Sequence, residues 1–111
     1  MKELDLEEYG REIIRYQNAP GELDNLNLQL SGWYAYYSSQ LIRLDLLEAK
    51  FFVNTKGKGE EKISDDMVKA LWKITEEGAE HVKVKQIVKT TEKLMSNIKA
   101  SIRRSEIESR I

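Results

Sequence analysis

The sequence predicts an all-α protein, and three observations support that class. Only one proline and six glycines occur among the 111 residues, and residues 79–111 contain neither. Charged residues make up 33% and hydrophobic residues 41%, a balance that suits a folded core rather than a disordered chain. Apolar residues also repeat at helical spacing along most of the chain. A chain of this length forms one domain at most, so we expect a single helical domain over residues 1–111.

A short helix is predicted over residues 4–16. Its apolar side chains lie at helical spacing, and acidic residues occupy its first turn, where the helix dipole favours them. Gly10 lowers the stability of this helix by about 1 kcal/mol relative to alanine. The turn-forming residues 18–21 are expected to end it.

A long helix is predicted over residues 22–54, with a length of about 50 Å at 1.5 Å per residue. One row of its apolar seam recurs every seven positions: Leu23, Leu30, Tyr37, Leu44 and Phe51. The alternate heptad row is Leu26, Trp33, Gln40 and Leu47. A second apolar band comprises Leu28, Tyr34, Leu41, Ile42, Leu46 and Val53. A helix with so much apolar surface should bury more than one face.

The second half of the chain begins with a basic, glycine-containing turn, predicted over residues 55–62. A short helix is predicted over 65–77, with Ser64 as its N-cap and Gly78 as its C-cap. The last helix is predicted over 79–108. It has one apolar face, with lysine and arginine side chains opposite.

These elements predict a long antiparallel helical hairpin with a short connecting helix. Apolar surface that one hairpin leaves uncovered should bind further copies, so the expected state is an oligomeric helical bundle of coiled-coil type. The predicted oligomer contacts are Leu30, Trp33, Tyr37, Leu44, Leu94, Ile98 and Ile102.

Composition also bears on location and on the kind of ligand. No stretch approaches the apolar length of a transmembrane helix, and the acidic N-terminus lacks the apolar run of a signal peptide. The absence of cysteine excludes disulfides and suits a reducing compartment, so we expect a soluble cytoplasmic protein without a membrane partner. Residues 1–82 carry a net charge of −6 and residues 83–111 a net +5. This asymmetry suits an acidic ligand or head-to-tail contact between the two halves.

Few residues in the sequence suit catalysis. His81 is the only histidine and is expected to be partly exposed; one histidine without cysteine assembles neither a metal site nor a catalytic triad. Glu76, Glu77 and Glu80 form E-E-x-x-E, the first half of the magnesium signature of all-α nucleotide pyrophosphohydrolases. The second half, E-x-x-D, is missing, because no aspartate follows Glu80. We expect no enzyme activity, no cofactor and no metal, and keep the pyrophosphohydrolase as a distant third hypothesis.

The segment Lys56-Gly57-Lys58-Gly59 has two interpretations. In the simpler one it is a solvated turn between helices. In the other, glycines let the backbone approach a ligand closely while the lysines neutralise phosphates. Its spacing is not that of a P-loop. Together with the basic face of the last helix, it favours a polyanion as the ligand.

Four short stretches within this order of helices point to a known family: Ser38-Ser39, Glu48-Ala49 with Val53, Lys56-Gly57-Lys58, and Ile98-Lys99-Ala100-Ser101. Over roughly residues 25–107, the chain resembles the phage recombination mediator family of the UvsY type, known from T-even bacteriophages. The resemblance implies a non-catalytic, ring-like oligomer that binds single-stranded DNA. Members of that family help to load a RecA-like recombinase onto strands covered by a single-strand-binding protein.

The resemblance also implies DNA-binding residues. It places Lys56 and Lys58 where the family carries a lysine and an arginine that contact DNA, and we add Lys50 and Lys62 as neighbouring candidates. The pI of about 5.9 is low for a DNA-binding protein, so affinity would come from repeating a weak basic site around an oligomer. A phage-encoded protein would act in the host cytoplasm. The alternative is a structural adaptor that self-assembles without nucleic acid.

Overall fold

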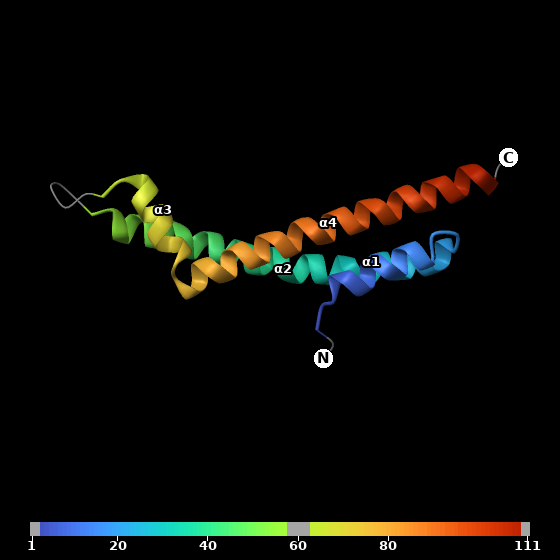
Figure 1. Ribbon diagram of the computed structural model, residues 1–111, viewed down its shortest axis with the longest axis horizontal. Coiled ribbons are helices and arrows are strands. Elements are labelled where there is room, and N and C mark those ends of the chain that lie inside the picture. The colour runs from blue at the N-terminus through green and yellow to red at the C-terminus, as the bar shows by residue number, and fades with distance from the viewer. Residues whose placement is uncertain (1–2, 58–62, 110–111) are drawn as a thin grey trace. The chain divides into compact units, whose positions relative to one another are not determined.

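The computed structural model describes residues 3–57 and 63–109 (Figure 1). Over these residues the protein is helical and contains no strand, which confirms the all-α class. The helices are α1 (Leu6–Arg15), α2 (Pro20–Lys56), α3 (Asp65–Lys73) and α4 (Glu76–Ser109). The chain divides into two compact units, one comprising Met1–Tyr36 with Val88–Ile111 and the other Tyr37–Ile87. Each long helix therefore contributes one part to each unit.

The starts of three helices follow from local chemistry. The Asp5 carboxylate accepts a hydrogen bond from the backbone N–H of Glu8 (3.0 Å), which satisfies one free donor of α1. Pro20 occupies the first position of α2, where its missing N–H costs nothing. The Ser64 hydroxyl accepts from the N–H of Met67 (3.2 Å) and caps α3, as the sequence predicts.

The junction between α3 and α4 differs from the prediction. α3 ends at Lys73, and Gly78 lies inside the first turn of α4, so its predicted role as the C-cap of α3 is wrong. The reason is Thr75, whose hydroxyl oxygen accepts from the N–H of Gly78 (2.9 Å) and so caps a new helix that begins at Glu76.

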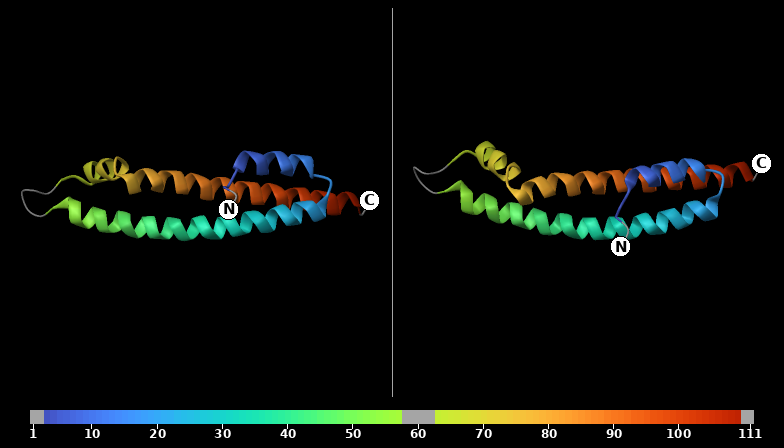
Figure 2. Two further views of the ribbon diagram at one scale, coloured as in Figure 1. Left: turned by 90° about the horizontal axis from the view of Figure 1, so that it is seen from below. Right: turned by 60° about the horizontal axis from the view of Figure 1, so that its bottom comes forward.

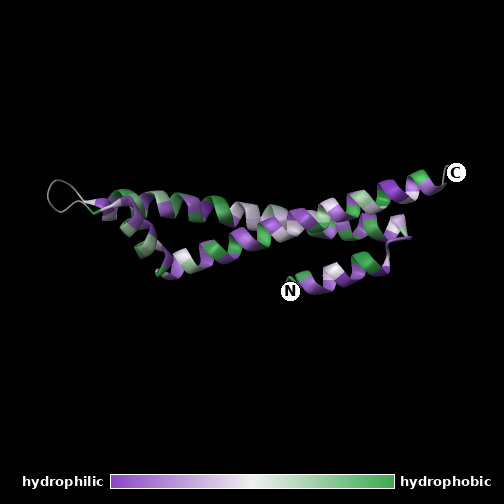
Figure 3. Ribbon diagram, turned by 45° about the horizontal axis from the view of Figure 1, so that its top comes forward, coloured by the Kyte–Doolittle hydropathy of each residue, from purple (hydrophilic) through white to green (hydrophobic). Residues whose placement is uncertain are grey.

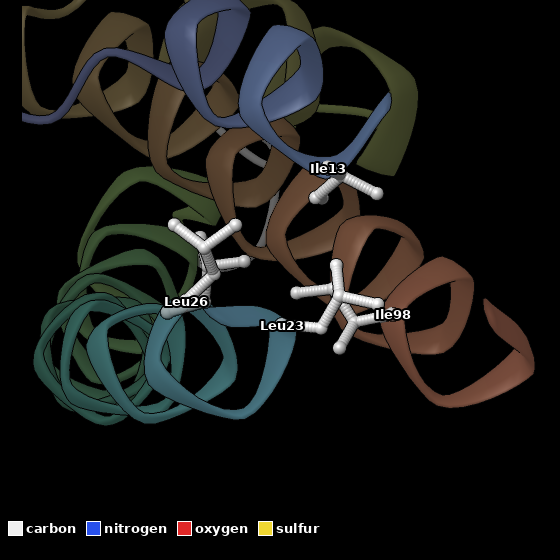
Figure 4. Close-up of a cluster of buried hydrophobic side chains, with 5 residues drawn as sticks. Ile13, Leu23, Leu26 and Ile98 are labelled. Atoms are coloured by element: carbon white, nitrogen blue, oxygen red, sulfur yellow. The ribbon is translucent and has the colours of Figure 1, made fainter. Parts of the chain in front are cut away.

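The first unit is held together by an apolar core from three helices. Ile13 of α1, Leu23 and Leu26 of α2, and Ile98 of α4 point into one space, together with the buried Leu30 (Figure 4). Both views in Figure 2 show α1 beside the later part of α4, and a short turn connects α1 to the start of α2. Full burial of one such side chain stabilises the fold by about 1.5–3 kcal/mol. This core accounts for the way α1 folds back on its neighbours.

Polar contacts at the edge of this core connect the same helices. The Tyr9 hydroxyl of α1 donates to the side-chain carbonyl of Gln29 in α2 (2.9 Å). The Tyr34 hydroxyl of α2 donates to the Glu92 carboxylate of α4 (2.8 Å). Both bonds lie at exposed positions, so they orient the helices more than they stabilise them.

The second unit has a smaller core. Leu44 of α2 is fully buried, and Val68 and Trp72 of α3 and Val84 of α4 are nearly so. The same set includes a polar residue, His81, which is only 2% exposed. The inward face of α3 thus carries Val68 and Trp72, one turn apart.

Hydrophobic segments recur along the helices in Figure 3, and those of α2 include both the fully buried Leu44 and the exposed Ile42. Among the predicted oligomer contacts, Leu30, Leu44 and Ile98 are fully buried within their own chain. The remaining predicted contacts are half-buried: Trp33, Tyr37, Leu94 and Ile102. The burial of the first three residues requires no second copy, and their contact with other copies stays a prediction. Over the described residues, no helix combines the length and apolar character needed to cross a membrane.

Candidate binding site

The second unit contains a hollow of about 420 Å³ formed by side chains of α2, α3 and α4. Its apolar lining comes from Ala49, Phe51, Phe52, Val68 and Trp72. Its charged lining comes from Asp45, Glu48, Lys69, Lys73 and Lys85. We call this feature the lysine-rimmed hollow.

The three lysines reach the hollow from two helices. Lys69 and Lys73 are four residues apart on α3, so they occupy successive turns of one face, while Lys85 comes from α4. All three are exposed. Among the described residues the lining contains two acids, Asp45 and Glu48, so the described charges of the rim sum to one net positive charge.

The aromatic lining is fixed by ring contacts. Trp72 is 6% exposed and lies against Phe51, with ring centroids 5.4 Å apart and planes tilted by 52°. Phe51 and Phe52 are half-buried, so each keeps an accessible part of its ring. Aromatic pairs at this distance are attractive beyond their buried area. The hollow therefore has an apolar floor of packed aromatic rings.

Beneath this floor, His81 connects the three helices. The indole N–H of Trp72 donates to His81 Nδ1 (3.2 Å), and His81 Nε2 lies 2.7 Å from Asp45 Oδ1. Because an indole nitrogen can only donate, Nδ1 must accept, and the ring proton lies on Nε2, from which it is donated to Asp45. Both ring nitrogens are thereby satisfied in a buried position. The expectation that His81 is partly exposed is wrong, because its partners come from α2 and α3.

The backbone carbonyl of Trp72 is also fixed by hydrogen bonds. Its carbonyl oxygen accepts from the hydroxyl (2.6 Å) and the N–H (3.0 Å) of Thr75. A Cβ atom added to Gly78 would lie 1.8 Å from this same oxygen. Only glycine lets α4 begin so close to the end of α3, and this fixes the position of the Trp72 ring.

Two of the four predicted DNA contacts, Lys50 and Lys56, belong to α2. Lys56 is its last residue; its ammonium nitrogen pairs with Asp65 (3.0 Å) and lies 5.5 Å from the Phe52 ring centre. Gly57 follows with φ of 77°, a left-handed conformation that glycine adopts easily. Lys50 is exposed on α2 and does not line the hollow. The other two predicted contacts, Lys58 and Lys62, lie outside the described residues.

The acidic motif lies at the start of α4. Glu76 and Glu77 are exposed, and Glu80 pairs with Arg43 at 3.2 Å, both side chains being about half exposed. Such a pair contributes at most about 1 kcal/mol to stability. Within the two described stretches of chain, no cluster of three acidic or histidine side chains is arranged to hold a metal ion.

The structure therefore brings together residues that the sequence analysis did not select. Lys69 and Lys73, which flank Trp72, were missed, and Lys85 was assigned only to a basic helix face. The i, i+4 spacing of Lys69 and Lys73 around a tryptophan was the available signal. Thr75 was also missed, although a threonine followed by two glutamates is a recognisable helix start.

In comparisons with known proteins, no protein-family model, curated protein or solved structure matches the chain significantly.

Proposed function

We propose that this protein is a non-catalytic, single-stranded DNA-binding protein and that the lysine-rimmed hollow is its DNA contact. The observation that carries the proposal is the convergence of Lys69, Lys73 and Lys85 on a hollow with an aromatic floor. Proteins that bind single strands without reading sequence combine these two elements, namely cations for the backbone and aromatic rings for the bases.

Each element has a distinct role in this proposal. The ammonium groups neutralise phosphates, and binding weakens with salt because counterions are released. A base packs on the accessible parts of Phe51 and Phe52, a contact worth about 1–3 kcal/mol per base. Lys56, which lies over the Phe52 ring and pairs with Asp65, adds a further cation at the end of α2.

One hollow of this size contacts few nucleotides, so we propose that an oligomer presents several copies to one strand. An antiparallel pairing of α2 and α4 within the chain is part of this proposal. In the first unit, Gln17, in the turn just before α2, contacts Ser105 of α4, and Tyr34 of α2 contacts Glu92 of α4, so the order of the contacts is reversed between the two segments. A role as a mediator that loads a RecA-like recombinase onto strands covered by a single-strand-binding protein rests on the family resemblance alone.

The test is fluorescence anisotropy of a labelled oligo-dT strand at low salt. We expect the triple variant Lys69→Ala/Lys73→Ala/Lys85→Ala to bind about tenfold more weakly or worse, because it loses three phosphate contacts. The matched control is Lys89→Ala/Lys93→Ala/Lys99→Ala, which removes the same charge from exposed positions of α4 in the other unit. Equal weakening in both variants would contradict the assigned site. Absence of binding by the folded wild-type protein would contradict DNA binding itself.

The second candidate function is a helical adaptor that acts by assembly without nucleic acid. It is favoured by a specific observation, namely the exposed apolar side chains of Ile42, Leu46 and Val53 on α2. The same anisotropy titration separates the two functions, because the adaptor leaves oligo-dT unbound at any salt concentration.

A further inference from the structure

The outer surface of α2 carries a second heptad pattern. We define the outer row as the residues at alternating spacings of four and three: Leu28, Gly32, Ala35, Ser39, Ile42, Leu46, Ala49 and Val53. Every one of these positions is exposed, and none carries a charge. An unbroken exposed row of small and apolar residues differs from the single apolar side chains that ordinary surfaces carry.

Within the second unit, Ile42, Leu46 and Val53 of the outer row lie on the side of α2 that faces away from the core, whereas Ala49 borders the lysine-rimmed hollow. Leu44 is fully buried, whereas Ile42 and Leu46, two positions before and after it, are each 62% exposed. Val53, at the end of the row, is 76% exposed. Residues two apart on a helix point to different sides, so one helix carries one covered and one uncovered apolar face. The same register continues toward the start of α2 through Ala35.

We propose that the outer row binds the outer row of a second copy of this chain, with the two α2 helices parallel and in register. Residues spaced alternately by four and three occupy the a and d positions of a coiled coil, and a row of this kind is complementary to itself. The small residues Ala35, Ser39 and Ala49 allow the two helices to approach closely. This inference rests on the self-association in the proposed function and requires no nucleic acid.

The charges beside the outer row select the parallel orientation. Arg43 and Lys50 flank the row on one side, and Asp45 flanks it on the other. In a parallel pair, a flanking residue on the Asp45 side faces the residue five positions further along its partner, so Asp45 faces Lys50 of the second copy. In an antiparallel pair, the side with Arg43 and Lys50 would face the same side of its partner, which brings like charges together. Asp45 remains 56% exposed despite its bond to His81, and Lys50 is exposed, so both are accessible for this contact.

The first experiment measures molar mass by light scattering without DNA. Wild type is expected to be a dimer or a multiple of dimers, and Ile42→Glu/Leu46→Glu to have half its mass, because four carboxylates would meet in the contact. The matched control Ile74→Glu/Val82→Glu changes exposed apolar residues away from the row and should keep the wild-type mass. A monomeric wild type, or an Ile42→Glu/Leu46→Glu variant of unchanged mass, would overturn the proposal.

Orientation is tested with Val53→Cys, since the chain has no cysteine of its own. Oxidation should link two copies through this position, because identical positions of the row face each other in a parallel pair. Ile74→Cys is the control and should stay unlinked. Failure of Val53→Cys to form a linked dimer would overturn the parallel arrangement. If Ile42→Glu/Leu46→Glu loses the wild-type mass but still binds some oligo-dT, both the pairing of the outer rows and the proposal of DNA binding are supported. If the wild-type protein is a dimer that does not bind oligo-dT, the proposal of DNA binding is contradicted and the pairing of the outer rows is not.

Discussion

Replacing His81 with alanine should destabilise the protein by about 3–4 kcal/mol. The change removes a ring that is 2% exposed and leaves a cavity between three helices. It also leaves the indole N–H of Trp72 buried without its present acceptor, at a cost of about 1–3 kcal/mol. A decrease of about 3–4 kcal/mol in the free energy of unfolding is a large part of the total stability of a small domain.

Two further variants separate the cavity from the lost hydrogen bond. His81→Phe keeps a ring of similar size and should cost about 1–3 kcal/mol, the penalty for the unpaired Trp72 donor. Adding Trp72→Phe removes that donor as well, so the double variant should be more stable than the sum of the two single changes. Urea unfolding followed by circular dichroism gives all of these free energies. Strict additivity of the two changes would show that the Trp72–His81 hydrogen bond contributes nothing.

Gly78→Ala should lower the free energy of unfolding by about 3 kcal/mol, because the new methyl group has no room. Its position lies 1.8 Å from the carbonyl oxygen of Trp72, a backbone atom that also accepts two bonds from Thr75. Relief requires α3 and α4 to separate at their junction, which would also displace the Trp72 ring from the hollow.

The matched control is Gly10→Ala in α1, where an added Cβ meets nothing within 4 Å. This change should stabilise the protein by about 0.5–1 kcal/mol, since alanine loses less backbone entropy in a helix. Both variants can be compared in one series of urea unfolding curves. A Gly78→Ala protein as stable as wild type would contradict the close approach of α4 to the Trp72 carbonyl at the end of α3.

The helices could be predicted because their signals are local. Ser64 with two following aspartates defines the start of α3, and the seven-residue repeat that includes Leu30 and Leu44 defines α2 and its buried face. The end of α3 was misplaced because Gly78 looks like a helix terminator in sequence. In the structure, Gly78 allows the start of α4 to approach the Trp72 carbonyl closely. This contact depends on how two helices meet, so no sequence pattern within either helix predicts it.

The candidate site was less predictable for the same reason. His81 reads as an isolated polar residue near a helix start, and its burial depends on Trp72 from α3 and Asp45 from α2. Lys85 joins Lys69 and Lys73 only because α4 returns past α3 within the second unit. Sequence periodicity places each residue on a face of its own helix, whereas it does not state which faces meet.

The most direct test of the central claim is the salt dependence of oligo-dT binding by wild type and by Lys69→Ala/Lys73→Ala/Lys85→Ala. For single strands, each phosphate contact contributes about 0.7 to the slope of log K against log salt concentration. Loss of three contacts at the lysine-rimmed hollow should therefore reduce the slope by about 2, whereas the control on α4 should leave it unchanged. Equal slopes for wild type and the triple variant would contradict the claim that DNA binds at this hollow.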